Sequence, residues 1–186
     1  MSLTLLSPPA AEPITLNELK EHLRVTQTDE DALITGILVA AVRAIEARGR
    51  LALMTQQWRV TMDAPPDETL FLPISPVSAV DAVSVIDANG APQSIDASLY
   101  EIALGAPGRV RGAGPWPAPG AALDGIRIDF TAGYADAASV PAPLKQAVKL
   151  LAAYFYEARE AAGEARLYTV PQSVDALIAP YRELRL

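Results

Sequence analysis

Apolar residues recur at helical spacing near both ends of this 186-residue chain and alternate with polar residues in the middle. A helix buries residues three and four apart on one face, whereas a strand buries every second residue. The spacing predicts helices in residues 14–49 and from Pro141 onward, with strands between Leu53 and Tyr134. Because neither long helical stripe can bury itself alone, the simplest fold packs the two ends together.

Two helices are expected in the first zone. Thr15 and Glu18 have the spacing of a capping box, which predicts the start of a short helix. Thr28 and Asp31 suggest a second cap, and Gly49 is expected to form the left-handed stop of the long helix that follows. The apolar stripe of this long helix comprises Leu33, Ile34, Ile37, Leu38, Ala41, Val42 and Ile45.

The middle zone predicts short strands joined by turns. Residues 57–63 alternate cleanly, and residues 126–130 give the clearest strand. Val83 and Val85 begin another strand, which is followed by the turn signal Asn89-Gly90. Sequential strands of this kind imply an antiparallel arrangement.

The last zone returns to helix after Pro141. Its stripe comprises Leu144, Ala147, Val148, Leu151, Tyr154, Phe155 and Ala158, and Gly163 interrupts it. A final short helix is expected after Pro171. The predicted fold class is therefore α+β, a helical bundle formed by the N- and C-terminal helices with an inserted antiparallel β lobe. Residues 1–50 and 140–186 are assigned to the bundle, which has a single discontinuous core, and residues 51–139 to the lobe.

Composition excludes several classes of function. The chain has no cysteine and one histidine, so disulfides, thiolate metal sites and cysteine nucleophiles are absent. Its net charge of −7 argues against a free-standing nucleic-acid binder, because gripping phosphates normally needs a basic face. The N-terminus lacks the basic region of a signal peptide, and the apolar run of residues 32–44 is too short to cross a bilayer. We expect no membrane partner.

No pattern in the sequence predicts catalysis, a cofactor or a metal. His22 lies on the polar side of the first helix without an orienting partner, so a solvated role is expected. Asp29-Glu30-Asp31 fits a helix start that matches the dipole better than a cation site. The loop of residues 105–120 lacks the Gly-Lys-Ser/Thr of a phosphate cradle.

The same loop region carries the candidate contact residues of the lobe. Arg109 and Arg111, two apart on a strand-like stretch, should project to one side, where they are either solvated or contact a DNA phosphate or a neighbour's carboxylate. Trp116 stands between two prolines and is either folded back on the lobe or offered to a partner.

Several stretches, taken in order, resemble those of the phage head–tail connector (adaptor) family, including prophage and gene-transfer-agent versions. Residues 105–120 match none of its motifs. The matching stretches are Ile14–Arg24, Asp29–Asp31, Thr55–Trp58, Phe130–Tyr134, Val140–Pro141 before a helix ending at Tyr156–Glu160, and Val170–Arg182.

The resemblance implies a structural protein that forms a ring under the portal at the particle neck, receives a stopper or tail protein on its other side, and lets DNA pass without sequence-specific binding. It implies synthesis in the bacterial cytoplasm, and we expect a free monomer that forms its ring on the portal. The terminal segment is either a portal-docking element or a helix folded on its own bundle. Its residues are Val174, Leu177, Ile178, Tyr181 and Arg182.

Two alternatives from other classes stay open at this stage. One is a small-molecule-binding or enzymatic domain with a pocket between bundle and lobe, lined by Tyr134, Arg127 and Asp129. The other is a generic interaction module that shares the topology without the role in a particle.

Overall fold

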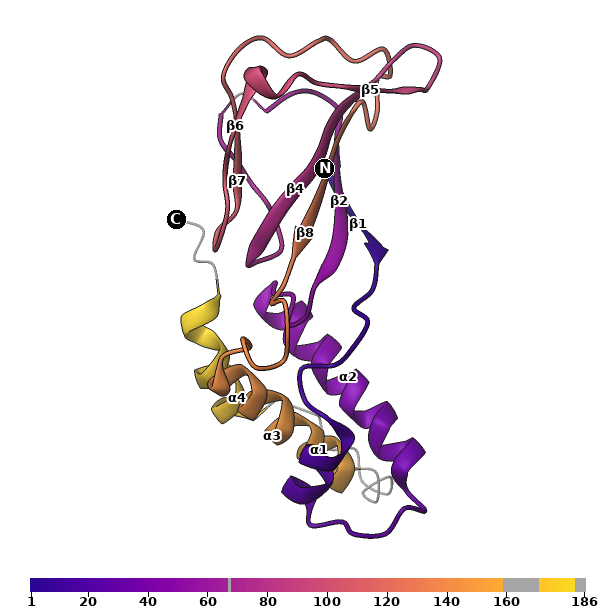
Figure 1. Cartoon of the computed structure of the whole chain (residues 1–186), viewed down its shortest axis with the longest axis vertical. Helices are drawn as coiled ribbons and strands as arrows, with labels where there is room; N and C mark the ends of the chain where they lie inside the picture. The colour runs from indigo at the N-terminus through magenta and orange to yellow at the C-terminus, as the bar shows by residue number, and fades with distance from the viewer. Residues whose placement is uncertain (67, 159–170, 183–186) are drawn as a thin grey trace. The chain divides into compact units, whose positions relative to one another are not determined.

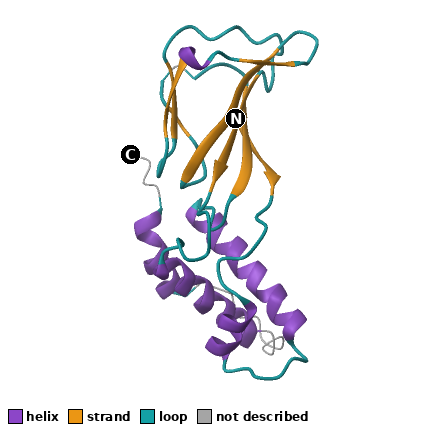
Figure 2. Ribbon diagram, in the orientation of Figure 1, coloured by secondary structure: helices purple, strands orange, loops and turns teal. Residues whose placement is uncertain are grey.

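The computed structural model describes residues 1–66, 68–158 and 171–182, and it confirms the α+β class (Figures 1 and 2). The chain divides into two compact units. The helical unit contains residues 11–54 and 135–186, and the β unit contains residues 1–10 and 55–134. Both units contain fully buried apolar side chains, so the β unit has a core of its own in addition to that of the helical unit.

The helical unit joins helices from both ends of the chain, as the sequence predicts. The second helix packs on the third, the third packs on the fourth, and the first contacts the second and third. Ile34, Ile45 and Leu144 are fully buried there. The elements are α1 (Leu16–Leu23), α2 (Asp31–Gly49), α3 (Ala142–Ala158), α4 (Gln172–Ile178) and the 3-10 turn η2 (Ala179–Tyr181). The expected interruption at Gly163 lies outside the described residues.

The helix ends confirm one predicted cap and correct two. Thr15 and Glu18 form the capping box of α1. The cap of α2 is Glu30, without a side-chain hydrogen bond, because the carbonyl of Thr28 and not its hydroxyl accepts the N–H of Asp31. Gly49 is still helical, and the left-handed residue after it is Arg50.

The β unit contains two antiparallel sheets. One has five strands in the order β1-β2-β8-β4-β5, and the other has three in the order β3-β7-β6. The strands are β1 (Ser2–Ser7), β2 (Gln56–Met62), β3 (Leu70–Phe71), β4 (Val77–Ile86), β5 (Pro92–Ser94), β6 (Tyr100–Ala103), β7 (Arg109–Gly112) and β8 (Ile126–Ala132), with the 3-10 turn η1 at Ala97–Leu99.

The core face of the large sheet follows from its register. Ile128 of β8 lies opposite Val60 of β2 and Val83 of β4, and all three are buried. The other face carries an ion pair between Arg59 and Asp129, whose side chains lie directly opposite each other. The predicted alternation of strands β2 and β8 is therefore correct.

The structure corrects the boundaries of the lobe and of one strand. The sequence pattern assigns residues 1–50 to the bundle, but residues 2–7 form strand β1 and pair with β2. Strand β4 begins at Val77, six residues before the alternation that starts at Val83, because two register shifts in residues 77–82 break the period of two.

Candidate interaction surfaces

The terminal helix α4 is folded on its own unit, and part of its surface stays accessible. Val174 and Ile178 are both 0% exposed, and α4 packs on α3. Leu177 and Tyr181 are half-buried, and Arg182 is exposed. The predicted docking residues therefore divide into two buried anchors and three residues that retain accessible surface.

Polar contacts fasten the same segment to the end of α2. The guanidinium of Arg48 forms a two-pronged ion pair with Asp175, with Nη2 to Oδ2 at 2.6 Å. Arg182 donates from Nε and Nη2 to the carbonyl oxygen of Arg48, at 3.1 and 3.0 Å. We call the contacts of Arg48, Asp175 and Arg182 the α4 latch.

The latch changes the acid–base properties of its members. The hydrogen bond from Arg48 lowers the pKa of Asp175, and the same bond raises the pKa of Arg48. Because both side chains are open to solvent, water and salt screen this pair, and it contributes less than a buried pair would. The buried contacts of Val174 and Ile178 therefore contribute most of the free energy that holds α4 on the helical unit.

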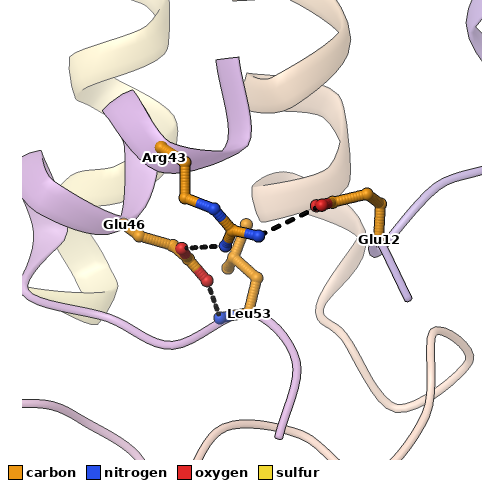
Figure 3. Close-up of polar contacts among 4 residues, drawn as sticks. All are labelled: Glu12, Arg43, Glu46 and Leu53. Carbon is orange, nitrogen blue, oxygen red and sulfur yellow. Dashed lines mark hydrogen bonds and ion pairs between the residues drawn. The ribbon is translucent and has the colours of Figure 1, made fainter. Parts of the chain in front are cut away.

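A second polar cluster lies on α2 and involves Arg43, Glu46, Glu12 and Leu53 (Figure 3). Arg43 donates to Glu12 at 3.1 Å and to Glu46 at 2.6 Å, and the other oxygen of Glu46 accepts the N–H of Leu53 at 2.9 Å. Residues 11–14 and 51–54 are where the chain joins and leaves the helical unit. The cluster therefore ties both connecting segments to one helix.

Glu12 is incompletely satisfied within this cluster. Its Oε2 atom is buried with no hydrogen-bond partner among the described residues. Burial raises the pKa of Glu12, and the nearby guanidinium of Arg43 offsets only part of that effect. Sequence patterns could not reveal this cluster, because Glu12 and Arg43 are far apart along the chain and belong to no shared periodicity.

Arg109 and Arg111 lie on the outer face of β7, as their spacing predicts. Val110 between them is fully buried, and both arginines are exposed. Arg111 lies opposite Glu101 of β6. The two arginines help to line a shallow hollow of about 240 Å³, together with Thr69, Glu101, Ile102 and Ala103.

Trp116 is folded back on the β unit. Its indole N–H donates to the carbonyl oxygen of Leu99 at 3.0 Å, and its ring meets that of Tyr100 edge-on at 6.3 Å. The indole therefore holds the loop after β7 against the segment that leads into β6.

Of the residues considered for chemistry, one is exposed and three form structural contacts. His22 is exposed on α1, and Asp31 forms an ion pair with Lys20 at 2.5 Å. Asp129 pairs with Arg59, and the carbonyl of Tyr134 accepts the hydroxyl of Thr55 at 3.0 Å. Within residues 1–66, 68–158 and 171–182, no three potential metal ligands come together.

None of the helices in the described residues has the length and hydropathy needed to cross a bilayer. The ion pairs of Asp31 and Asp129 and the hydrogen bond to the Tyr134 carbonyl hold helix ends and strands in place. The accessible side chains of α4 and of β7 are therefore the candidate interaction surfaces.

Comparison with known proteins identifies the class more closely. The model of the head completion protein family matches residues 12–184, and the chain belongs to this family. It therefore has the structural role of a head–tail adaptor, as the resemblance in the sequence implies. A search of curated proteins gives no match.

Three solved structures are similar to this chain, and each match covers its full length. A chain in the neck of an empty gene transfer agent (GTA) particle, computed with C6 symmetry, is 31% identical with a TM-score of 0.84, covering 100% of this chain and 97% of that one. A chain in the virion of the native GTA particle has 31% identity and a TM-score of 0.83, at the same coverage. A third, from the neck of the native particle computed with C12 symmetry, has 30% identity and a TM-score of 0.81, again at that coverage.

Proposed function

We propose that this chain forms a ring of identical subunits at the neck of a tailed phage or gene-transfer particle, between the portal and a stopper or tail-completion protein. The full-length likeness to chains in GTA necks, computed with C6 and C12 symmetry, is the observation that carries the proposal. DNA passes through the central hole without sequence-specific contact. The net charge of −7 suits a channel that must not retain DNA.

The proposed role assigns no catalytic step, cofactor or metal to the chain. A neck ring acts by shape and by affinity for its neighbours. Such a ring needs heterologous contacts, in which one face of each subunit meets a different face of the next. The free subunit must stay soluble beforehand, so we expect a monomer in dilute solution, which light scattering measures directly.

In this proposal the portal binds the terminal segment, residues 171–182. Val174 and Ile178 anchor α4 to its own unit, and the α4 latch sets its position. The accessible sides of Leu177, Tyr181 and Arg182 then form the contact surface. Tyrosine and arginine side chains are enriched at the centre of protein interfaces, and Leu177 adds apolar surface beside them.

We also propose a partner contact on the outer face of β7. Arg109 and Arg111 carry no ion pair with another described residue, although the chain as a whole is acidic. Two guanidiniums on one side of a strand suit a carboxylate on a neighbouring protein or the backbone of passing DNA. Trp116 is half-buried against Leu99 and Tyr100, and this proposal assigns it no partner contact.

The direct test mixes the purified protein with portal-bearing capsids that lack a neck and images them by cryo-electron microscopy. We expect ring density under the portal, with α4 against it. Leu177→Glu and Tyr181→Glu should reduce capture by the capsids at least tenfold. Leu104→Glu, a change at an exposed leucine of the β unit, is the matched control and should bind like the wild type. Absence of ring density would overturn the proposed function.

A further inference from the structure

Strand β1 forms an open edge of the large sheet. It pairs with β2 on one side, and no described strand pairs with its other side. All six of its residues are exposed, and none is charged. Leu3, Leu5 and Leu6 are 38%, 42% and 42% exposed.

The apolar face of the sheet continues onto this edge. Leu3 lies opposite Val60, and Leu5 lies opposite Trp58. Soluble proteins usually protect such an edge with charged residues, proline or a covering element, because its free N–H and C=O groups pair readily with another strand. The nearest prolines, Pro8 and Pro9, come after β1 has ended.

The edge is also held in a fixed conformation. The hydroxyls of Ser2 and Thr61 hydrogen-bond at 2.5 Å, and Thr61 donates to Asp124 at 2.7 Å. These bonds fix the first residue of β1 against its neighbour. A strand that is already ordered loses little conformational entropy when it pairs with a partner.

A second open edge lies at the opposite side of the same sheet, on residues 78–82 of β4. Val77 exchanges backbone hydrogen bonds with Gly105, and Val83 accepts one from Ile95, but no described strand pairs with the residues between them on that side. The residues are Ser78, Ala79, Val80, Asp81 and Ala82, and the carboxylate of Asp81 accepts the hydroxyl of Thr131 at 2.8 Å. Ser78, Asp81 and Ala82 are exposed, and Ala79 and Val80 are half-buried.

We propose that β1 of one subunit adds to the 78–82 edge of β4 in the next copy of this chain, so that the large sheets continue from subunit to subunit around the ring. This inference rests on the proposed neck ring. Pairing β1 with β1 would use the same edge twice and stop at a dimer, whereas pairing β1 with β4 uses two different edges, as a closed ring requires. Main-chain hydrogen bonds supply the affinity, as in other strand additions.

Disulfide cross-linking tests the contact cleanly, because the chain has no cysteine of its own. Thr4→Cys is combined in turn with Ser78→Cys, Ala79→Cys or Ala82→Cys; Thr4, Ala79 and Ala82 lie on the same face of the sheet. The two edges of one subunit are three strand spacings apart, about 14 Å, which is beyond the reach of a disulfide within one chain. Each double variant is mixed with portal-bearing capsids, oxidised, and run on a denaturing gel.

We expect at least one double variant to give a ladder of covalent oligomers longer than a dimer, and Thr4→Cys alone to give none. If wild-type protein forms the ring but all three double variants remain monomers, or if Thr4→Cys alone gives dimers, the strand pairing is overturned. If wild-type protein forms no ring on the portal, the proposed function itself fails. The two failures are therefore distinguishable.

A charge placed on the edge gives an independent test. Leu3→Lys with Leu5→Lys should lower ring occupancy on the portal at least tenfold, because a charged edge resists strand addition. Leu123→Lys, at a loop leucine that is 75% exposed, is the matched control and should stay within twofold of the wild type. Thermal unfolding of each variant verifies that its fold is intact. Wild-type occupancy of the doubly substituted protein would overturn the inference.

Discussion

At the scale of single residues, Gly49 shows how packing can determine a residue that local signals explain differently. A sequence argument makes it the left-handed stop of α2, but the stop is Arg50, with φ of 53°. A Cβ atom at Gly49 would lie 2.7 Å from Leu51 Cδ1 and 3.2 Å from Ile178 Cγ2. The glycine therefore allows the chain after α2 and the terminal helix to approach closely.

Gly49→Ala should destabilise the helical unit by about 1–3 kcal/mol, as overpacking of a core usually does. Gly36→Ala is the matched control on the same helix, because nothing lies within 4 Å of its added methyl group. It should stabilise the protein by about 0.5–1 kcal/mol through helix propensity. Denaturant unfolding of both variants measures the difference. Equal effects of the two changes would contradict the packing role of Gly49.

Glu12 gives a pH prediction. Its pKa is raised by burial above the ordinary value of 4.5, so the folded protein binds this proton more tightly than the unfolded chain does. Stability from this group therefore falls as the pH rises from 4.5 through the raised native pKa. Glu12→Gln should remove that dependence and be more stable than the wild type above this range, as measured by denaturant unfolding from pH 4 to pH 8.

Glu18 is the natural control for this experiment, because its pKa shifts the other way. The backbone hydrogen bond from Thr15 lowers the pKa of Glu18, so the stability that it contributes is present above 4.5 and lost on acidification. Glu18→Gln should thus be less stable than the wild type at pH 7, and the difference should shrink in acid. If both variants respond alike, the orphaned oxygen of Glu12 does not set the pH dependence.

At the scale of elements, some predictions from neighbouring residues are correct and others are not. The Thr15 and Glu18 box and the alternation of β8 depend on neighbours in sequence, and the structure confirms both. Strand β4 was only partly predicted, because its bulges in residues 77–82 disturb the alternation. Strand β1 was missed, because its partner β2 lies about fifty residues away and its leucines do not alternate strictly.

The contribution of the α4 latch to the local stability of residues 171–182 can be tested directly. Asp175→Asn removes the charge that pairs with Arg48, so residues 171–182 should exchange their amide hydrogens several-fold faster. The lowered pKa of Asp175 means that the latch contributes above the ordinary value of 3.8 and is lost as the pH falls through the native pKa. Wild-type protein should therefore approach the variant's exchange in acid.

Asp29→Asn is the control for the latch, because it removes a carboxylate of the same charge from an exposed position of the helical unit. Its exchange in residues 171–182 should match the wild type at every pH. Unchanged exchange in Asp175→Asn would mean that Val174 and Ile178 hold the helix without help from the ion pair.

At the scale of the whole molecule, the prediction that the two ends of the chain meet is correct, since α2 packs on α3. The helical period of the two apolar stripes was enough to establish this. The interaction surfaces were harder to predict, because a sequence shows which residues are apolar but not which of them a neighbour already covers. Val174 and Ile178 were candidates for docking, yet both are fully buried in the subunit itself.

The presence of two cores predicts two separable unfolding transitions. Both tryptophans of the chain, Trp58 and Trp116, belong to the β unit, so their fluorescence follows that unit, while far-UV circular dichroism follows the helices. Leu144→Ala, at a fully buried position of α3, should lower the stability of the helical transition by about 2–5 kcal/mol and leave the fluorescence transition in place. Phe130→Ala, at a fully buried position of β8, should do the reverse by about 3–5 kcal/mol. If each variant shifts both signals equally, the chain unfolds as one cooperative body and each unit depends on the other for its stability.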